Sequence, residues 1–241
     1  DGCVMLDCTH LSEKLINEKL KQIRQLGIDF ADVDMVKEPV PIRPGMHYQM
    51  GGIKTDVDGQ TPVPGLYAAG ETACVSVHGG NRLGANSLLD TLVFGRRSGQ
   101  HASEWSRNIS HKNVTDSAAD PDKNEIQEML DRDGNAESYG QVRLEMGQTM
   151  NRGLAVFRDQ QGMAEARAKL AELRDRFGRV AVADKGKTFN TNLIFTLELG
   201  FMLDCAETIA VGALERKESR GAHFRTDMPD RDDEHWLKHI L

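Results

Sequence analysis

The sequence predicts an α+β chain in which short strands precede a helical domain. Glycine and proline interrupt residues 38–85 at short intervals, which is typical of short strands and turns. Apolar residues recur at helical spacing on both sides of that stretch, and four helical segments follow one another after residue 121. The 241 residues, of which 39% are hydrophobic and 28% charged, suffice for one large domain or two smaller ones.

The first part of the chain contains one helix and several short extended segments. Residues 10–27 are predicted to form an amphipathic helix, with Gly27 as its stop signal. Three prolines require an extended backbone over residues 38–45. The glycine and aspartate spacing that follows predicts a short strand at 50–56, a turn at 56–61 and a buried strand at 64–71 that ends on a glycine.

A second helix is predicted over residues 86–106. Asn86 and Ser87 are its expected caps. Its expected apolar core face consists of Leu88, Leu89, Leu92, Val93 and Phe94. The polar residues 107–121 indicate a linker, and the charged tail 219–241 is expected to pack irregularly across another surface. Helical periodicity between them predicts a small helical domain with helices at 122–132, 136–152, 161–177 and 190–218.

Composition and charge exclude several classes of protein. The net charge of -7 argues against nucleic-acid binding, which usually needs a basic face. The four cysteines (Cys3, Cys8, Cys74 and Cys205) match neither a zinc module nor a disulfide framework, so we interpret them as buried reduced thiols and predict no metal site. No segment is long and apolar enough to span a membrane, and no signal peptide is visible. Because the chain does not open with methionine, we expect the natural polypeptide to begin upstream.

The first candidate site residue is Glu71, which follows a predicted strand and Gly70. In open α/β sheets, ligands bind at the carboxyl ends of strands. A glycine there lets a ligand approach the backbone, and the carboxylate accepts hydrogen bonds from sugar or ribityl hydroxyls. Many FAD proteins carry this strand–Gly–acid pattern, although a structural strand followed by a turn explains it equally well.

A second candidate site surrounds Arg82, which lies in a glycine-rich run before the helix expected at residue 86. The planar guanidinium suits a carboxylate. The helix N-terminus presents free N–H groups and a partial positive charge, which suit the anionic N1–O2 edge of a reduced flavin. A surface salt bridge beside a capped helix is the structural alternative, and the glycine setting argues against it. His47, shortly before Gly51 and Gly52, is a candidate hydrogen-bond donor to an anionic substrate, although a single histidine is more often structural.

These motifs resemble the flavoprotein subunits of succinate dehydrogenase and fumarate reductase, in order and in spacing. The resemblance rests on His47-Tyr48-x-Met50-Gly51-Gly52-Ile53, on Pro64-Gly65-Leu66-Tyr67-Ala68-Ala69-Gly70-Glu71, and on His78-Gly79-x-Asn81-Arg82-Leu83-Gly84-x-Asn86-Ser87-Leu88-Leu89-Asp90. Arg158, the run Phe189-Asn190-Thr191 and the tail from Lys217 to His239 extend it along the chain. It implies the end of a capping domain at 1–45, the C-terminal return segment of a Rossmann-like FAD domain at 46–106, a linker at 107–121, and a helical C-terminal domain with its tail at 122–241.

The resemblance also implies a reaction and a set of partners. Succinate and fumarate would be interconverted by hydride transfer to or from FAD, and electrons would pass to an iron–sulfur subunit. His47 and Arg82 would hold one substrate carboxylate. FAD would be bound by Glu71 through its ribityl or ribose hydroxyls, by backbone N–H groups of Ser87 and Leu88, and by Asn86, Gly51 and Gly52. The implied setting is electron transport and the tricarboxylic acid cycle. The subunit would be peripheral, attached to membrane anchor subunits on the cytoplasmic face of the inner membrane or on the mitochondrial matrix side.

Three parts that the resemblance implies are missing from the sequence. No Gly-x-Gly-x-x-Gly opens a βαβ unit. The histidine for covalent FAD attachment and the proton-donating arginine would both lie upstream of residue 1. We therefore expect no catalytic residue in this chain, weak or no FAD binding by the chain alone, and no turnover.

Two other functions stay open. L-aspartate oxidase shares the strand–Gly–Glu pattern and the Asn-Arg-Leu-x-x-Asn-Ser-Leu pattern, although Gly84-Ala85-Asn86 and the tail after Lys217 are closer to the dehydrogenase. A non-catalytic structural or interaction module built on the helical domain is the second. The sequence does not fix whether succinate oxidation or fumarate reduction is preferred.

Overall fold

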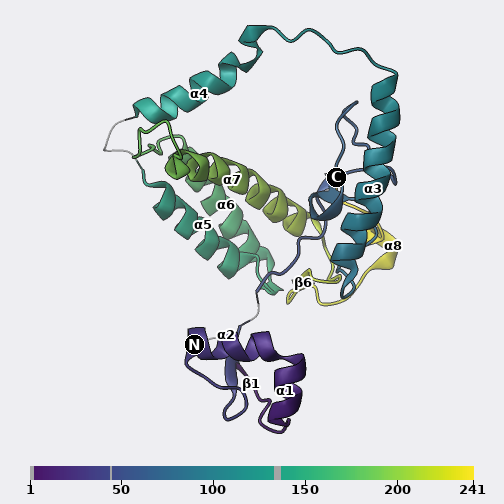
Figure 1. The fold of residues 1–241 in the computed structure, drawn as a ribbon, viewed down its shortest axis with the longest axis vertical. Helices are drawn as coiled ribbons and strands as arrows, with labels where there is room; N and C mark the ends of the chain where they lie inside the picture. Colours follow the sequence, from purple (N-terminus) through teal and green to yellow (C-terminus); the bar gives the residue numbers. More distant parts are fainter. Residues whose placement is uncertain (1–2, 44, 133–136) are drawn as a thin grey trace. The chain divides into compact units, whose positions relative to one another are not determined.

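The computed structural model describes residues 3–43, 45–132 and 137–241 (Figure 1). The chain divides into two compact units, Asp1–Gln49 and Met50–Leu241. Helices are interspersed with small two-stranded sheets, so the predicted α+β class is confirmed. Each unit has a hydrophobic core of its own.

The first unit combines two short helices with a two-stranded sheet. Strand β1 (Val4–Leu6) pairs antiparallel with β2 (Val40–Ile42), which agrees with the extended backbone predicted at 38–45; Pro44 lies outside the described residues. The single helix predicted at 10–27 is wrong, because Leu20 has φ −128° and separates α1 (Glu13–Lys19) from α2 (Lys21–Ala31). The core of the unit consists of Cys8, Ile16, Met35 and Val40.

Gly27 was predicted to stop the helix, but the helix continues past it. Helix α2 continues to Ala31 and ends at Asp32, which adopts the left-handed conformation with φ 54°. The chain then turns back so tightly that a Cβ atom on Gly27 would lie 2.9 Å from the Val33 carbonyl oxygen. Gly27 therefore permits the close return of the chain after the helix, one turn beyond the predicted end.

The second unit begins with a small parallel sheet of β3 (Ile53–Lys54) and β4 (Ala73–Cys74), so the strand predicted at 50–56 is shorter than expected. The turn at 56–61 is confirmed by a hydrogen bond from Gly59 N–H to the Asp56 oxygen. The strand predicted at 64–71 is wrong. Among the described residues, the segment 64–71 has one strand-like pairing, an isolated bridge between Tyr67 and Gln60. The chain then enters the 3-10 turn η1 (Gly70–Thr72). A strand requires a neighbour along its length, and apolar composition alone does not provide one.

Helix α3 (Asn86–Arg107) confirms the helix predicted at 86–106, but its predicted core face is exposed. Leu88 and Leu92 are 76% and 72% exposed, whereas the buried residues of α3 are Asp90 and Ser98. The loop around Gly59 covers the opposite side of the helix, because a Cβ atom on Gly59 would lie 2.7 Å from the Ser98 Cβ atom. Periodicity identified the apolar face of α3 correctly and gave no information on what covers it.

The core of the second unit lies among α5 (Tyr139–Gly153), α6 (Gln160–Phe177) and α7 (Thr191–Glu215), which run side by side in Figure 1. It includes Val142, Leu173 and Leu199, one from each helix and all fully buried. The 3-10 turn η2 (Asp116–Ala119) precedes α4 (Asp120–Asp131). The four predicted helices are therefore confirmed, although the start predicted at residue 136 lies outside the described residues and the last helix ends before residue 218.

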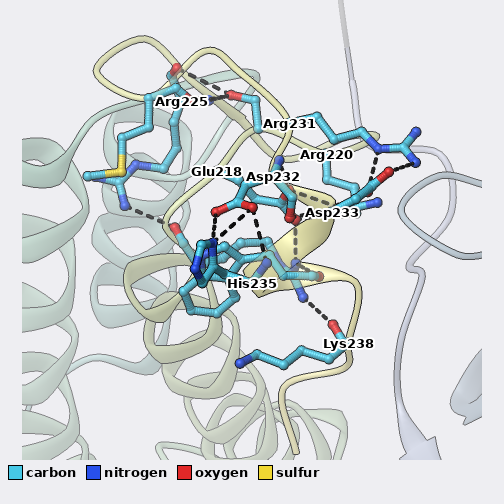
Figure 2. Close-up of polar contacts among 12 residues, drawn as sticks. Glu218, Arg220, Arg225, Arg231, Asp232, Asp233, His235 and Lys238 are labelled. Atoms are coloured by element: carbon cyan, nitrogen blue, oxygen red, sulfur yellow. Dashed lines mark hydrogen bonds and ion pairs between the residues drawn. The ribbon is translucent and has the colours of Figure 1, made fainter.

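The tail after α7 is more ordered than its charged sequence suggested. Strand β5 (Phe157–Arg158) pairs in parallel with β6 (Phe224–Arg225), and a short helix, α8 (Asp233–Trp236), follows. Figure 2 shows the polar network that holds these segments together, with the carboxylate of Glu218 near its centre. Glu218 and Arg225 are both fully buried in it.

The interpretation of the cysteines needs correction. Only Cys8 is buried, whereas Cys74 is half-buried and both Cys3 and Cys205 are exposed. All four are free thiols. Across residues 3–43, 45–132 and 137–241, no helix has the length and apolar character that crossing a membrane requires.

Candidate functional site

The candidate site is built around the first turn of α3. The residue before the helix is Ala85, which has φ 65° and contributes no side-chain cap. Asn86 and Ser87, the predicted caps, are instead the first two helical residues. Because its capping residue has only a methyl side chain, the helix keeps backbone N–H groups and a partial positive charge for an anionic ligand.

The turn that carries Glu71 packs against this end of α3. A Cβ atom on Gly70, which has φ 74°, would lie 3.2 Å from Thr91 Oγ1. That hydroxyl in turn donates to the Ser87 carbonyl oxygen at 2.9 Å. Glu71 is exposed, and its turn is linked to Ser87 through Thr91.

The glycine pair Gly51–Gly52 lies on the other side of the same turn. Both glycines have positive φ, 93° and 117°, and a Cβ atom on Gly52 would lie 2.5 Å from the Thr72 oxygen. Only glycine fits this approach without displacing the backbone. The predicted cofactor residues Gly51, Gly52, Glu71, Asn86, Ser87 and Leu88 thus belong to one continuous framework, made of β3, η1 and the start of α3.

Arg82 lies in the loop that leads into α3, and this loop is closed at its base. His78 Nε2 lies 3.2 Å from Asp90 Oδ2, and both side chains are largely buried. The ends of the segment 78–90 are thereby brought together, with Arg82 between them. Arg82 is half-buried, and its Nη1 donates to the Leu83 oxygen at 3.1 Å.

His47 belongs to the first unit, where it is exposed. The other predicted site residues belong to the second unit. The pairing of His47 with Arg82 around one substrate carboxylate therefore stays a prediction.

The residues at the start of α3 fit a flavin. Ser87 Oγ is buried and has no hydrogen-bond partner among the described residues, so it offers a polar group to a ligand. Three apolar side chains in this segment are mainly exposed: Leu83 at 72%, Leu88 at 76% and Leu92 at 72%. An isoalloxazine ring presents a flat apolar surface with a polar edge, which matches this combination of groups. Across the described ranges there is no cluster of three or more His, Cys, Asp or Glu side chains that suits a metal ion.

Two residues that the motifs included without a role come together in the paired strands of the tail. Arg158 Nη1 donates to His223 Nδ1 at 3.0 Å, across the paired strands β5 and β6. Burial, followed by the charges of Arg158 and Arg225, lowers the pKa of His223 to about 4. His223 is therefore a neutral hydrogen-bond acceptor at pH 7, a role that its sequence alone does not reveal because Arg158 is distant in the chain.

Comparison with known proteins gives two family matches. Residues 143–241 match the family described as fumarate reductase flavoprotein C-term, and residues 1–88 match the FAD binding domain family. The chain is 44% identical over 242 residues to a fumarate reductase flavoprotein subunit of Haemophilus influenzae, covering 99% of this chain and 40% of the relative. It is 41% identical over 249 residues to a succinate dehydrogenase flavoprotein subunit of Coxiella burnetii, covering 99% and 42%. The chain thus spans about two fifths of the length of these relatives.

Solved structures give the same result. A quinol-fumarate reductase with menaquinol molecules superposes with a TM-score of 0.94 at 42% identity, over 98% of this chain and 42% of that one. Mycobacterium smegmatis Sdh1 in complex with UQ1 superposes with a TM-score of 0.84 at 34% identity, over 95% and 38%. These matches confirm the resemblance and agree with FAD as the cofactor.

Proposed function

We propose that this chain, which belongs to the flavoprotein-subunit family of fumarate reductase and succinate dehydrogenase, forms the part of such a subunit that binds a dicarboxylate beside FAD. The reaction is the interconversion of succinate and fumarate. The observation that supports it most is the framework at the start of α3. There the turn of Glu71, the glycine pair and the loop of Arg82 meet an N-terminus without a side-chain cap.

The residues of this chain have distinct roles in the proposal. The Arg82 guanidinium binds one substrate carboxylate through paired hydrogen bonds, and His47 donates to the same carboxylate. The backbone N–H groups of Ser87 and Leu88, together with the helix dipole, stabilise negative charge beside them.

FAD, when bound, supplies a hydride acceptor and donor. Gly51, where a Cβ atom would meet nothing within 4 Å, leaves room for it along the backbone, and Gly52 permits the turn of Glu71 to pack closely. Asn86 completes the site at the first position of α3. Glu71 accepts hydrogen bonds from its hydroxyl groups. The proton donor is assigned to a residue outside this chain.

The partners in this proposal are an iron–sulfur subunit and membrane anchor subunits. The flavoprotein is peripheral in such an assembly, on the cytoplasmic face of the inner membrane or on the matrix side of the mitochondrial one. Support comes from the similarity to structures described with menaquinol and with UQ1.

The test is dye reduction by the complete, FAD-loaded flavoprotein that contains this sequence, with succinate and L-aspartate compared side by side. We expect activity on succinate, inhibited by malonate. Arg82→Ala removes a charged hydrogen-bonding partner worth about 1.5–3 kcal/mol, so the KM for succinate rises roughly 10- to 150-fold. His47→Ala is expected to raise it less, because a single hydrogen bond is lost instead of the paired bonds of a guanidinium.

The matched control is Arg167→Ala, which removes an exposed arginine of α6. Activity on L-aspartate alone assigns the chain to the oxidase instead. A folded preparation that binds no FAD and reduces no dye with either substrate supports a non-catalytic module.

A further inference from the structure

The C-terminal tail touches the loop that carries Arg82. Arg220 and His223 exchange two backbone hydrogen bonds, of 2.8 and 3.0 Å, which close a tight turn at Gly221 and Ala222. At the tip of this turn, the Ala222 N–H donates to the Gly80 carbonyl oxygen at 2.9 Å. Gly80 lies two residues before Arg82.

The two backbones pack without space for side chains. Gly221 has φ 58°, the sign that the first central residue of a two-residue type II′ hairpin turn requires. A Cβ atom on Gly221 would overlap the Gly80 carbonyl group, and one on Gly80 would lie 3.1 Å from the Arg220 Cγ atom. Glycine is therefore needed at position 221 both for its conformation and for this contact.

The turn is itself fixed by ion pairs. Arg220 Nε donates to Glu218 Oε1 at 2.6 Å, and Arg220 Nη2 donates to Asp233 Oδ1 at 2.7 Å (Figure 2). Glu218 also accepts from the Asp232 N–H at 2.7 Å. These bonds tie the turn to the end of α7 and to α8, so its tip presents Ala222 to the loop from a rigid base.

We propose that the turn at Gly221 and Ala222 is a positioning element for Arg82. The loop is held at its base by His78 and Asp90 and on its flank by the tail, and Arg82 lies between these two attachments. A loop fixed at two points keeps the guanidinium in one place relative to the first turn of α3. Misplacement of such a group by about 1 Å costs up to 100-fold in an active site. This inference rests on the proposed role of Arg82 as the carboxylate-binding residue.

The test uses the complete, FAD-loaded flavoprotein, with malonate as the probe of dicarboxylate binding. Gly221→Ala forces the tail away from the loop, and we expect malonate to bind about tenfold more weakly. Gly80→Ala brings a Cβ atom to 3.1 Å from the Arg220 Cγ atom and 3.3 Å from its carbonyl oxygen, a milder clash, so we expect a smaller effect in the same direction. Gly212→Ala is the matched control, because a Cβ atom there meets nothing within 4 Å, and it should leave malonate binding unchanged.

A double-mutant cycle separates positioning from general damage. If the tail acts through Arg82, Gly221→Ala has little further effect on malonate binding in an Arg82→Ala background. Fully additive losses, or unchanged malonate binding in both single glycine variants, would overturn the inference. Should Gly221→Ala not yield folded protein, Gly80→Ala takes its place in the cycle.

Amide hydrogen exchange over residues 78–85 gives a readout that needs no activity. We expect exchange there to be roughly tenfold faster in Gly221→Ala than in Gly212→Ala, since the loop has lost its second attachment. Unchanged exchange contradicts the inference. If Arg82→Ala alone leaves malonate binding intact, the proposed role of Arg82 fails, and the exchange result still decides whether the tail holds the loop.

Discussion

Replacing Glu218 with glutamine tests what holds the C-terminal tail in place. The carboxylate is fully buried and accepts hydrogen bonds from Arg216, Arg220 and the Asp232 N–H, at 2.6 to 3.0 Å. Burial by itself raises the pKa of Glu218, but these donors outweigh it and lower the pKa to about 2. The group is therefore ionised in the folded protein at neutral pH.

Glutamine keeps the shape of the side chain but loses its charge. One terminal oxygen becomes an NH2 group, which cannot accept from an arginine. Removing one partner of a buried ion pair costs about 3–5 kcal/mol. Arg216 keeps its bonds to the Trp236 and Lys238 oxygens and Arg220 keeps Asp233, so we expect the lower end of that range, about 3 kcal/mol.

The assay is urea unfolding of the chain, followed by tryptophan fluorescence. The Arg216 guanidinium lies 5.4 Å from the ring centre of Trp236, so Trp236 emission reports on this region. Glu215→Gln is the control, because Glu215 is exposed and its replacement should change the free energy of unfolding by no more than about 0.5 kcal/mol. Equal unfolding midpoints for the two variants would refute the reasoning.

Glu218 should also make the stability of the folded chain depend on pH. Its folded pKa lies below the ordinary value of 4.5, so the stability it contributes is present above that value. This contribution is lost as the pH falls from about 4.5 toward 2, because the unfolded chain takes up the proton first. Glu218→Gln should lack this step when stability is measured across that pH range.

The remaining predictions concern the site and the core. Gly52→Ala strains a backbone with φ 117° and forces its Cβ against the Thr72 carbonyl, so the complete flavoprotein should be purified with less FAD, as measured by flavin absorbance per subunit. Leu199→Ala leaves a cavity in the helical core and should lower the free energy of unfolding by about 2–5 kcal/mol, whereas Leu144→Ala, at an exposed position, should cost far less in the same urea titration. The isolated 241-residue chain should bind FAD weakly or not at all in equilibrium dialysis, and a tight one-to-one complex would contradict this. The His223 ring should show no protonation step between pH 6 and 8 by NMR, because its lowered pKa keeps it neutral there.

Sequence periodicity predicted the helices well where the pattern was long. Helix α3 and the helices of the core begin and end within a few residues of their expected positions. The errors lie where a single backbone angle or a missing neighbour decides the structure. Leu20 breaks one helix by its φ angle alone, and residues 64–71 have a strand-like sequence without a strand beside them. Neither fact is encoded in local apolar spacing.

The candidate site was only partly predictable. The motifs identified Glu71, Arg82 and the glycine pair by residue type, and the structure explains why Gly52 has to be a glycine. The contact between the tail and the loop of Arg82 could not be predicted from the sequence, because it is made by backbone atoms of Gly80 and Ala222. Backbone contacts between distant segments leave no chemical signature other than the glycines that permit them.

The polar network of the tail fixes the orientation of the turn at Gly221 and Ala222. A buried set of ion pairs is seldom more stable than apolar residues of the same volume, so stability alone does not account for a fully buried Glu218. An apolar cluster would tolerate small rotations of the turn, whereas the Arg220 guanidinium meets Glu218 and Asp233 at fixed hydrogen-bond angles. That orientation determines where Ala222 meets Gly80. A network that specifies geometry is what a turn requires if it is to hold in place Arg82, the arginine for which we propose a substrate-binding role.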